Sequence, residues 1–323
     1  MSQEVTLIPG TGHGPAVASV AREVLAAAGA SLTWDEQLCE GGDISGAVAS
    51  IRRTGWALKG PIASEIRKGQ LPPTVRLRRE LGVYAIVRHV KHVPGLPARA
   101  PQTDLVVVRE ASEDIYAGFE HESADGVFES VKVTTRAACE RIATFAFDYA
   151  QTHGRGRVTT VHKANILKKA DGMFLSVSRE VAARYPGIRH DDIIVDALCM
   201  RLVRRPRDFD VLLCGNLFGD IVSDCASGMA GGVTVASGVN YGPGVTVFEA
   251  TPGVRGADLP EGAANPYPMI LLAAELADAL GHAQAAGRVR AAVSAALTAG
   301  VTTHDMGGVA AVDAVRSAVL GAL

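Results

Sequence analysis

The chain has 323 residues, 48% of them hydrophobic, and its 32 Lys and Arg nearly balance its 34 Asp and Glu. A chain of this length is expected to form two lobes, because a single hydrophobic core rarely grows beyond about 250–300 residues. The balanced charge gives no electrostatic footprint for nucleic acid, and no apolar run approaches the roughly 18 residues that a membrane span needs. We therefore expect a small-molecule substrate as partner, no nucleic acid and no membrane.

Short β-branched segments alternate with helical segments along the chain, which predicts an α/β fold. A strand near residues 5–8 precedes a helix over 15–28 and a strand over 31–34. Further strands are predicted over 55–59, 83–87, 104–108, 129–133, 158–161, 192–195 and 210–214. A helix over 136–150 repeats Ala138, Ile142, Phe145 and Tyr149 on one face, and mostly helix is predicted from Pro268 onward.

The N-terminus and the cysteines indicate a cytoplasmic protein. Residues 1–10 lack a basic segment followed by a long apolar run, which a secretory signal would have. The five cysteines are odd in number and form no Cys-x-x-Cys pair, as is typical of reduced thiols that pack as small core or surface residues.

Three glycines, Gly10, Gly12 and Gly14, follow the first predicted strand. Their spacing is Gly-x-Gly-x-Gly and not the Gly-x-Gly-x-x-Gly of a dinucleotide-binding loop. A tight strand-to-helix turn is an equally good interpretation, because glycine tolerates the positive φ that such turns need.

Three aspartates predict a metal site. Asp220 and Asp224 follow the apolar strand over 210–214 and stand one helical turn apart on one face. Such a pair is usually a solvated helix face, since like charges repel. Here the surrounding sequence is apolar and glycine-rich, so a divalent cation would best compensate the two carboxylates. Asp196 ends another apolar strand, where α/β proteins commonly build sites. Oxygen ligands favour Mg2+ or Mn2+.

Motifs that resemble one family occur in the same order along most of the chain. They are IPGTGHGP, LRRELGVYAIVR, DLVVVREASEDIYAG, VKVTTRAACERIA, TTVHKANILKKADGMF, IIVDALCMRLVRRPRDFDVLLCGNLFGDIVSD and GAANPYP. Together they resemble the β-decarboxylating dehydrogenases, which include isocitrate, homoisocitrate and 3-isopropylmalate dehydrogenases. The resemblance implies NAD(P)-dependent and metal-dependent oxidative decarboxylation of a 3-substituted malate.

The resemblance also implies an architecture. It is an isopropylmalate dehydrogenase-like two-domain α/β fold with a large mixed sheet that is not a Rossmann sheet. Residues 1–97 and 248–323 would form an outer, nucleotide-side domain, and residues 98–247 an inner domain with the dimer interface and a clasp. The protein would be an intertwined homodimer with shared active sites, in which Lys163 and Asp196 reach into the cleft of the partner subunit.

The family's functional residues transfer to matching positions. The resemblance makes Asp196, Asp220 and Asp224 the metal ligands and gives substrate binding to Arg78, Arg88, Arg109 and Thr74. The planar guanidinium fork suits the malate carboxylates, although lone arginines are normally surface groups. Lys163 would remove the hydroxyl proton, which requires a lowered pKa, and Tyr116 would protonate the enolate carbon. The other interpretation of Tyr116 is a half-buried packing residue.

The sequence of the predicted nucleotide site differs from the family pattern in one segment. By resemblance it comprises Asn165, Gly253, Asp258, Asn265 and Asp305. Residues 251–260 have lost the adenine-packing histidine of the family. Asp258 would accept from ribose hydroxyls and repel a 2′-phosphate, so NAD is expected, with Arg255 keeping NADP as an alternative.

A second departure concerns the substrate. Residues 67–76 match neither the isocitrate nor the isopropylmalate pattern and are nearer to homoisocitrate enzymes. Arg67, Lys68 and Arg76 could receive a carboxyalkyl or phosphonoalkyl arm, or they are solvated helix charges. The alternatives are an isopropylmalate, tartrate or D-malate dehydrogenase and, in another class, a non-catalytic regulatory subunit. A regulatory subunit should have lost some of the metal or proton-transfer groups, and all of them are present here.

Overall fold

The computed structural model describes residues 3–62, 71–251 and 262–323. The chain forms two compact units. The terminal unit comprises Met1–Gly82, His92–Pro101 and Gly231–Leu323, and the central unit comprises Val83–Lys91 and Gln102–Ala230. The domain boundaries expected from the sequence stay a prediction, and the structure is described below by these two units.

The terminal unit contains five strands in the order β2-β1-β3-β12-β11. These are β1 (Gln3–Ile8), β2 (Leu32–Glu36), β3 (Trp56–Lys59), β11 (Gly238–Gly242) and β12 (Val245–Glu249). The pairs formed by β1 with β2, β1 with β3 and β3 with β12 are parallel, and β11 is antiparallel to β12.

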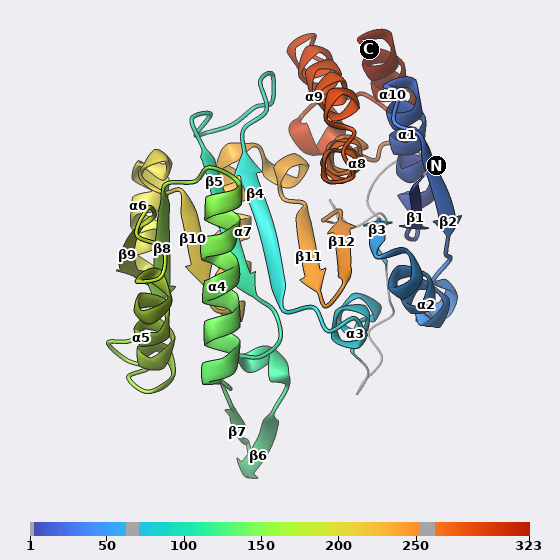
Figure 1. The fold of residues 1–323 in the computed structure, drawn as a ribbon. Coiled ribbons are helices and arrows are strands. Elements are labelled where there is room, and N and C mark those ends of the chain that lie inside the picture. The colour runs from blue at the N-terminus through green and yellow to red at the C-terminus, as the bar shows by residue number, and fades with distance from the viewer. Residues whose placement is uncertain (1–2, 63–70, 252–261) are drawn as a thin grey trace. The chain divides into compact units, whose positions relative to one another are not determined.

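Helices of the terminal unit come from both ends of the chain. They are α1 (Gly14–Ala27), α2 (Ser45–Thr54), α3 (Pro73–Glu80), α8 (Tyr267–Ala279), α9 (Ala283–Thr298) and α10 (Val312–Gly321). Helix α8 is the most buried of them, with nine of its residues in the core. Helices α1 and α9 pack against it, and α10 packs against α1 and α9 (Figure 1). The helical C-terminal part expected from Pro268 onward is therefore confirmed.

The glycine loop after β1 is a tight turn. Gly10 and Gly12 have positive φ angles of 90° and 60°. A Cβ atom on Gly10 would lie 2.3 Å from the carbonyl oxygen of Pro61, and Thr11 donates its backbone N–H to the same oxygen at 2.9 Å. Close backbone approach thus explains glycine at position 10.

The central unit contains five strands in the order β4-β5-β10-β8-β9. These are β4 (Ala85–Lys91), β5 (Asp104–Glu110), β8 (Arg157–His162), β9 (Arg189–Ile194) and β10 (Val211–Cys214). Strand β4 is antiparallel to β5, and the other pairs are parallel. The expected α/β class is confirmed, and the strands of each unit form a mixed sheet of parallel and antiparallel pairs.

Four helices cover the central strands. Helices α4 (Arg136–Thr152) and α5 (Ala170–Ala182) lie on one face, and α6 (Val195–Arg204) and α7 (Asn216–Ala230) lie on the other (Figure 1). Short 3-10 turns connect elements of both units: η1 (Glu40–Gly42), η2 (Ile115–Ala117), η3 (Pro206–Asp208), η4 (Gly232–Val235) and η6 (His304–Met306).

Two sequence predictions in this unit were wrong in detail. Phe145 and Tyr149 lie only half-buried at the edge of α4, because the buried stripe runs through Ile142, Ala146 and Ala150. Phe145 packs edge-on against Tyr84 instead. The strand expected over 129–133 is two features, since a strand ends at Ser130 and Val133 forms a single bridge.

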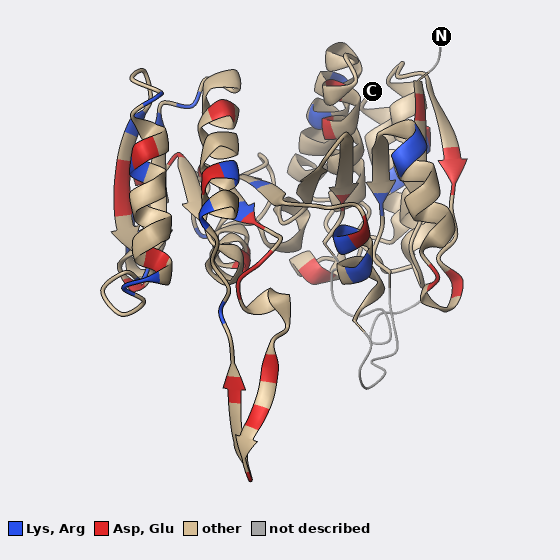
Figure 2. Ribbon diagram, turned by 60° about the horizontal axis from the view of Figure 1, so that its bottom comes forward, with Lys and Arg blue, Asp and Glu red and all other residues tan. Residues whose placement is uncertain are grey.

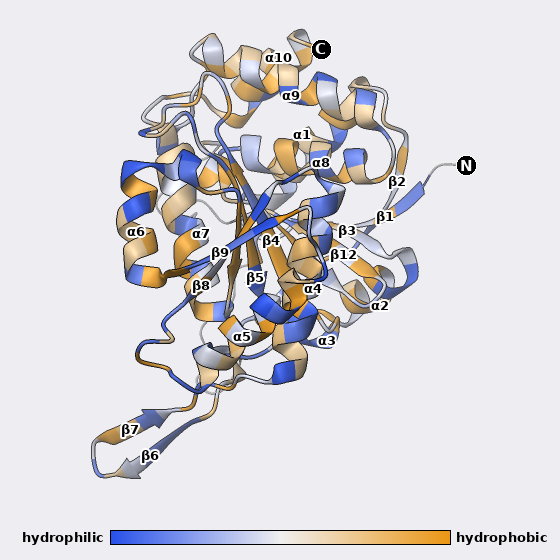
Figure 3. Cartoon of the chain, turned by 60° about the vertical axis from the view of Figure 1, so that its left-hand side comes forward, coloured by the Kyte–Doolittle hydropathy of each residue, from blue (hydrophilic) through white to orange (hydrophobic). Residues whose placement is uncertain are grey.

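An exposed hairpin projects from the central unit. It consists of β6 (Glu120–Ala124) and β7 (Val127–Ser130), paired antiparallel. Acidic residues occur on both strands (Figure 2), and hydrophobic residues stand among the hydrophilic ones (Figure 3). Phe128 is 68% exposed.

Two further findings concern membrane-spanning helices and the reactivity of the cysteines. In the part of the chain that the structure describes, no helix is both long and apolar enough to span a membrane. The five cysteines are free thiols, and burial raises the pKa of Cys139 to about 12, so this thiol is not a nucleophile at neutral pH.

Candidate active site

Four parallel strands of the central unit end at one edge of the sheet. Strands β5, β10, β8 and β9 run in the same direction. Arg109 stands at the end of β5, Lys163 follows β8 directly, and Asp196 follows β9 by two residues. Helix α7, with Asp220 and Asp224, begins two residues after β10. The predicted catalytic groups of this unit thus all follow strand ends at this edge, where α/β proteins commonly place their sites.

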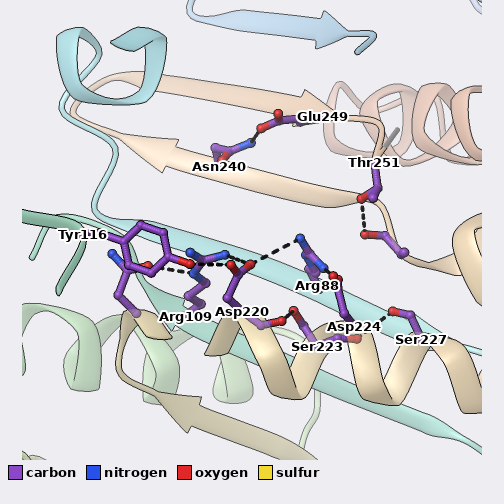
Figure 4. A network of polar contacts seen from close by, with 12 residues as sticks. Arg88, Arg109, Tyr116, Asp220, Ser223, Asp224, Ser227, Asn240, Glu249 and Thr251 are labelled. Carbon is purple, nitrogen blue, oxygen red and sulfur yellow. Dashed lines mark hydrogen bonds and ion pairs between the residues drawn. The ribbon is translucent and has the colours of Figure 1, made fainter. Parts of the chain in front are cut away.

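Asp220 is the centre of a polar cluster (Figure 4). The Tyr116 hydroxyl donates to its Oδ2 at 2.5 Å, and the Arg109 guanidinium pairs with its Oδ1. Arg88 lies 4.0 Å from the same Oδ1 and pairs with Asp224. Five predicted site residues are therefore brought together. Two cations offset two carboxylates that would otherwise repel each other one helical turn apart.

Arg109 is held by residues that the sequence interpretation did not single out. Its side chain is only 5% exposed, and its Nε donates to Oδ1 of Asn216 at 2.9 Å. A Cβ atom on Gly219 would lie 2.7 Å from Cβ of Arg109, so α7 passes this close only because residue 219 is glycine. Gly219 itself was the sequence signal for this close approach, because a glycine inside an otherwise helical segment usually marks a packing constraint.

The Tyr116 hydroxyl keeps its proton at neutral pH. Tyr116 lies in η2, and partial burial together with the hydrogen bond to Asp220 raises its pKa above the ordinary value. The Arg109 guanidinium, 5.0 Å from the ring centroid, opposes this shift only in part. A protonated phenol beside a carboxylate can donate a proton to a reacting carbon.

Lys163 and Asp196 form a separate, solvent-facing pair. The Lys163 Nζ donates to Oδ1 of Asp196 at 2.8 Å, and this hydrogen bond lowers the pKa of Asp196. The side chain of Asp196 is 70% exposed. Among the described residues, no group of three His, Cys, Asp or Glu side chains could hold a metal ion together. Asp196 thus stands apart from the other two predicted ligands within one chain.

The chemistry of the α7 carboxylates fits a divalent cation. Asp220 and Asp224 are 35% and 64% exposed, so both can be reached from solvent. They offer hard oxygen ligands, which suit Mg2+ or Mn2+. Two carboxylates alone leave most of a coordination sphere to substrate, water or a further acidic group.

In the terminal unit, Arg78 belongs to a buried polar cluster around Glu249. Arg78 donates to Oε2 of Glu249 at 2.8 Å, and Lys59, itself 1% exposed, donates to Oε1 at 2.9 Å. Asn240 adds a third hydrogen bond at 3.0 Å (Figure 4). Burial alone would raise the pKa of Glu249, but the two cations lower it well below the ordinary value.

We expect this cluster to make stability depend on pH. A carboxyl with a lowered pKa stabilises the fold above its unfolded pKa, and this contribution is lost as the pH falls through the folded value. Glu249→Gln should cost about 3–5 kcal/mol near pH 7, since it leaves the buried ammonium of Lys59 without its counter-ion. Below pH 4.5 the difference between wild type and variant should shrink.

Urea unfolding from pH 7 to pH 3 measures this effect. Glu36→Gln is the matched control, because Glu36 forms an exposed pair with Arg22 at 3.0 Å, and such pairs contribute at most about 1 kcal/mol. A wild-type to Glu249→Gln difference that is the same at pH 7 and pH 3 would contradict the assignment.

Some of the predicted nucleotide-binding residues lie in the described part of the chain. Asn265 donates to Oδ2 of Asp305 at 2.9 Å in the terminal unit, so these two residues are brought together. Their amide and carboxylate suit the hydrogen-bonding groups of an adenosine. Asn165 is exposed in the loop after β8 of the central unit. Gly253, Arg255 and Asp258 lie outside the described residues.

Some of the residues predicted to bind the substrate and its side arm also lie in the described part of the chain. Thr74 is half-buried in the first turn of α3. Arg76 lies on the same helix and donates to the carbonyl of Gly42. Arg67 and Lys68 lie outside the described residues.

Comparisons with known proteins agree over the whole chain. The family model for isocitrate/isopropylmalate dehydrogenase matches residues 4–319. Regulatory subunit 1 of the mitochondrial NAD isocitrate dehydrogenase of Arabidopsis thaliana is 40% identical, over 99% of this chain and 89% of that protein. Catalytic subunit 5 of the same organism is 39% identical, over 94% and 84%. The crystal structure of isocitrate dehydrogenase from Methylococcus capsulatus superposes with a TM-score of 0.91 at 37% identity, covering 100% and 99%.

Proposed function

The chain belongs to the isocitrate/isopropylmalate dehydrogenase family, and on that premise we propose that it oxidises and decarboxylates a 3-substituted malate with NAD and Mg2+ or Mn2+. One observation supports this proposal most directly: the cluster in which Tyr116, Arg109 and Arg88 surround the α7 carboxylates. The cluster offers cations for substrate carboxylates, oxygen ligands for a metal and a protonated phenol for the reacting carbon.

The proposed reaction has two bond-breaking steps. Lys163 accepts the proton of the C2 hydroxyl, and the hydride on C2 leaves for the nicotinamide ring, so that C2 becomes a carbonyl. The bond between C3 and its carboxylate then breaks and CO2 leaves. The electron pair of that bond forms an enolate, and the Tyr116 hydroxyl gives its proton to C3. The product is a 2-oxo acid.

Each group is suited to its step. The raised pKa of Tyr116 keeps the proton available, and Asp220, 2.5 Å away, orients the hydroxyl. Arg88 and Arg109 can bind substrate carboxylates through their planar donors. A divalent cation held by the aspartates would supply positive charge next to the oxygen that becomes negative.

The position of the Lys163–Asp196 pair favours a second copy of this chain as partner. The pair lies apart from Asp220 within one chain, and exposed apolar side chains lie near it in sequence. Ile166 is 68% exposed, and Met200 and Val203 on α6 are 56% and 67% exposed. Exposed apolar surface of this kind marks interaction sites. We therefore keep the homodimer with shared active sites as our proposal, with a heteromer of unlike subunits as the alternative.

A regulatory subunit is the second candidate function. A regulatory subunit is as similar to this chain as a catalytic one, at 40% against 39% identity. The presence of Tyr116, Lys163 and the aspartates favours a catalytic chain. The cytoplasmic location expected from the sequence stays a prediction, because both of these relatives are named as mitochondrial.

The substrate arm and the choice of NAD over NADP are the finer parts of the proposal. We keep an anionic carboxyalkyl or phosphonoalkyl arm, because a cationic residue, Arg76, lies on the same helix as Arg78 and Thr74. Isopropylmalate, tartrate and D-malate stay as alternatives.

Assay of the purified chain tests this proposal. Isocitrate, homoisocitrate, a phosphonoalkyl-substituted malate, isopropylmalate, tartrate and D-malate are supplied with each nicotinamide cofactor, and reduced cofactor and CO2 are measured together. We expect one mole of CO2 per mole of NADH, loss of turnover in EDTA and recovery with Mg2+ or Mn2+. Preference for isopropylmalate would reject the anionic arm, whereas turnover that survives full chelation would reject the metal. No turnover with any substrate would favour the regulatory subunit.

A further inference from the structure

A half-buried lysine outside the predicted catalytic set connects the segments that carry that set. Lys132 lies between the hairpin β6–β7 and helix α4 in the central unit, and its side chain is 21% exposed. Its Nζ donates to Oδ2 of Asp114 at 3.0 Å and lies 3.4 Å from Oδ1 of Asp171. Both carboxylates are 4% exposed. A single cation therefore compensates two buried carboxylates from different segments.

Asp114 fixes the turn that carries Tyr116 and the start of α7. Its Oδ1 accepts from the backbone N–H of Ile115 at 2.8 Å, at the beginning of η2. Its Oδ2 accepts from the N–H of Leu217 at 3.2 Å, in the first turn of α7. Asp114 is also the one non-glycine residue with a positive φ, 76°, in the described part of the chain. Such a conformation is strained and persists only where its surroundings enforce it.

Asp171 fixes the segment that carries Lys163. Its Oδ2 accepts from the backbone N–H of Lys163 at 2.7 Å, and its Oδ1 faces Lys132. The Lys132 ammonium also lies 5.5 Å from the ring centroid of Phe218 on α7. Asp114, Lys132, Asp171 and Phe218 line the same cavity.

We infer that Lys132 is a positioning residue that sets three catalytic segments at once: the Tyr116 turn, the metal-binding start of α7 and the Lys163 strand end. This inference rests on the roles given to Tyr116 and Lys163 under the proposed function. Without the ammonium, two buried carboxylates face each other uncompensated, and like charges at this depth repel strongly. The segments that they hold then separate or reorient.

Lys132→Met tests this inference, because methionine keeps the length of the side chain and removes its charge. We expect kcat to fall by roughly 100-fold with KM changed little, as misplacement by about 1 Å can cost this much. Lys132→Arg should recover most of the loss. Lys91→Met is the matched control, since Lys91 is 60% exposed and pairs with Asp104 in the same unit. It should leave kcat unchanged.

Amide hydrogen exchange separates positioning from general destabilisation and needs no activity. In Lys132→Met, the amides of Ile115, Lys163 and Leu217 should exchange at least about tenfold faster, because they donate to the two freed carboxylates. Amides in the middle of α4 should be unchanged. Equal acceleration throughout the central unit, or unchanged protection at all three amides, would overturn the inference.

Lys132→Gln covers the case in which Lys132→Met does not fold. The neutral and shorter glutamine amide can donate to one of the two carboxylates but leaves both charges uncompensated, so an intermediate loss of kcat and faster exchange at one of the two carboxylate-bound segments are expected. Full activity with wild-type protection would overturn the inference. A wild-type protein without dehydrogenase turnover would instead reject the proposed function and leave the exchange result to decide on Lys132.

Discussion

Tyr116→Phe should lower kcat for oxidative decarboxylation by about 10²- to 10⁴-fold, the usual contribution of a positioned proton donor. Phenylalanine keeps the ring over which Arg109 lies and removes only the hydroxyl that donates to Asp220. The rates that fall should be those of the steps after hydride transfer, above all protonation of the enolate. Reduction of an oxaloacetate-type 2-oxo intermediate by NADH should be slowed much less than protonation of the enolate.

Tyr185→Phe is the matched control for this variant. The Tyr185 hydroxyl also donates to an aspartate of the central unit, Asp148, at 2.7 Å, so both variants delete the same kind of hydrogen bond. The control should retain wild-type kcat. Equal losses in hydride transfer and in enolate protonation for Tyr116→Phe would favour the packing role of this tyrosine.

The pH profile gives an independent check. Burial and Asp220 raise the pKa of Tyr116 above the ordinary value near 10. Its protonated form is lost only above that pH, so enolate protonation in the wild type should show no decline due to this group between pH 7 and pH 9. A titration of the protonation step in this range would assign the proton to another residue.

Most strands of the parallel pairs could be predicted because they follow from local sequence, whereas the strands over 120–124, 238–242 and 245–249 were missed. The metal site stays a prediction. The apolar strand before Asn216 and the i, i+4 spacing of Asp220 and Asp224 fix the start and the exposed face of α7. The face of α4 was misjudged, because the packing of Phe145 depends on Tyr84, which lies far away in sequence.

The parts of the site that could not be predicted depend on tertiary contacts. Nothing in the local sequence shows that the Arg109 guanidinium is held by Asn216, and Gly219 signals a packing constraint without showing that Arg109 is the neighbour. The conformation of Asp114 is equally hidden, because a positive φ at a non-glycine residue is enforced by distant partners such as Lys132. Residue identity therefore predicts which groups react, whereas the structure is needed to find what holds them.

Mixing two inactive variants should restore activity if the active sites are shared between subunits. Lys163→Met and Asp220→Asn should each be nearly inactive as homodimers. In a mixed dimer one site carries both lesions and the other carries neither, so a statistical mixture should regain about a quarter of wild-type activity, given the two-fold symmetry. The basis is that Lys163 pairs with Asp196 at 2.8 Å, apart from the carboxylates of α7.

The matched control mixes two variants whose lesions belong to the same side of the site. Asp220→Asn and Asp224→Asn both alter the α7 pair, which Arg88 bridges, so every site of a mixed dimer retains one lesion and no activity should return. Subunit exchange is verified by native mass spectrometry with one variant isotopically labelled. If Lys163→Met and Asp220→Asn form mixed dimers and recover nothing, Lys163 acts within its own chain. Because Lys163 and Tyr116 would then serve one site, the fixed link between them through Lys132 would hold a single catalytic centre together. Recovery would mean that the same link joins residues of two centres.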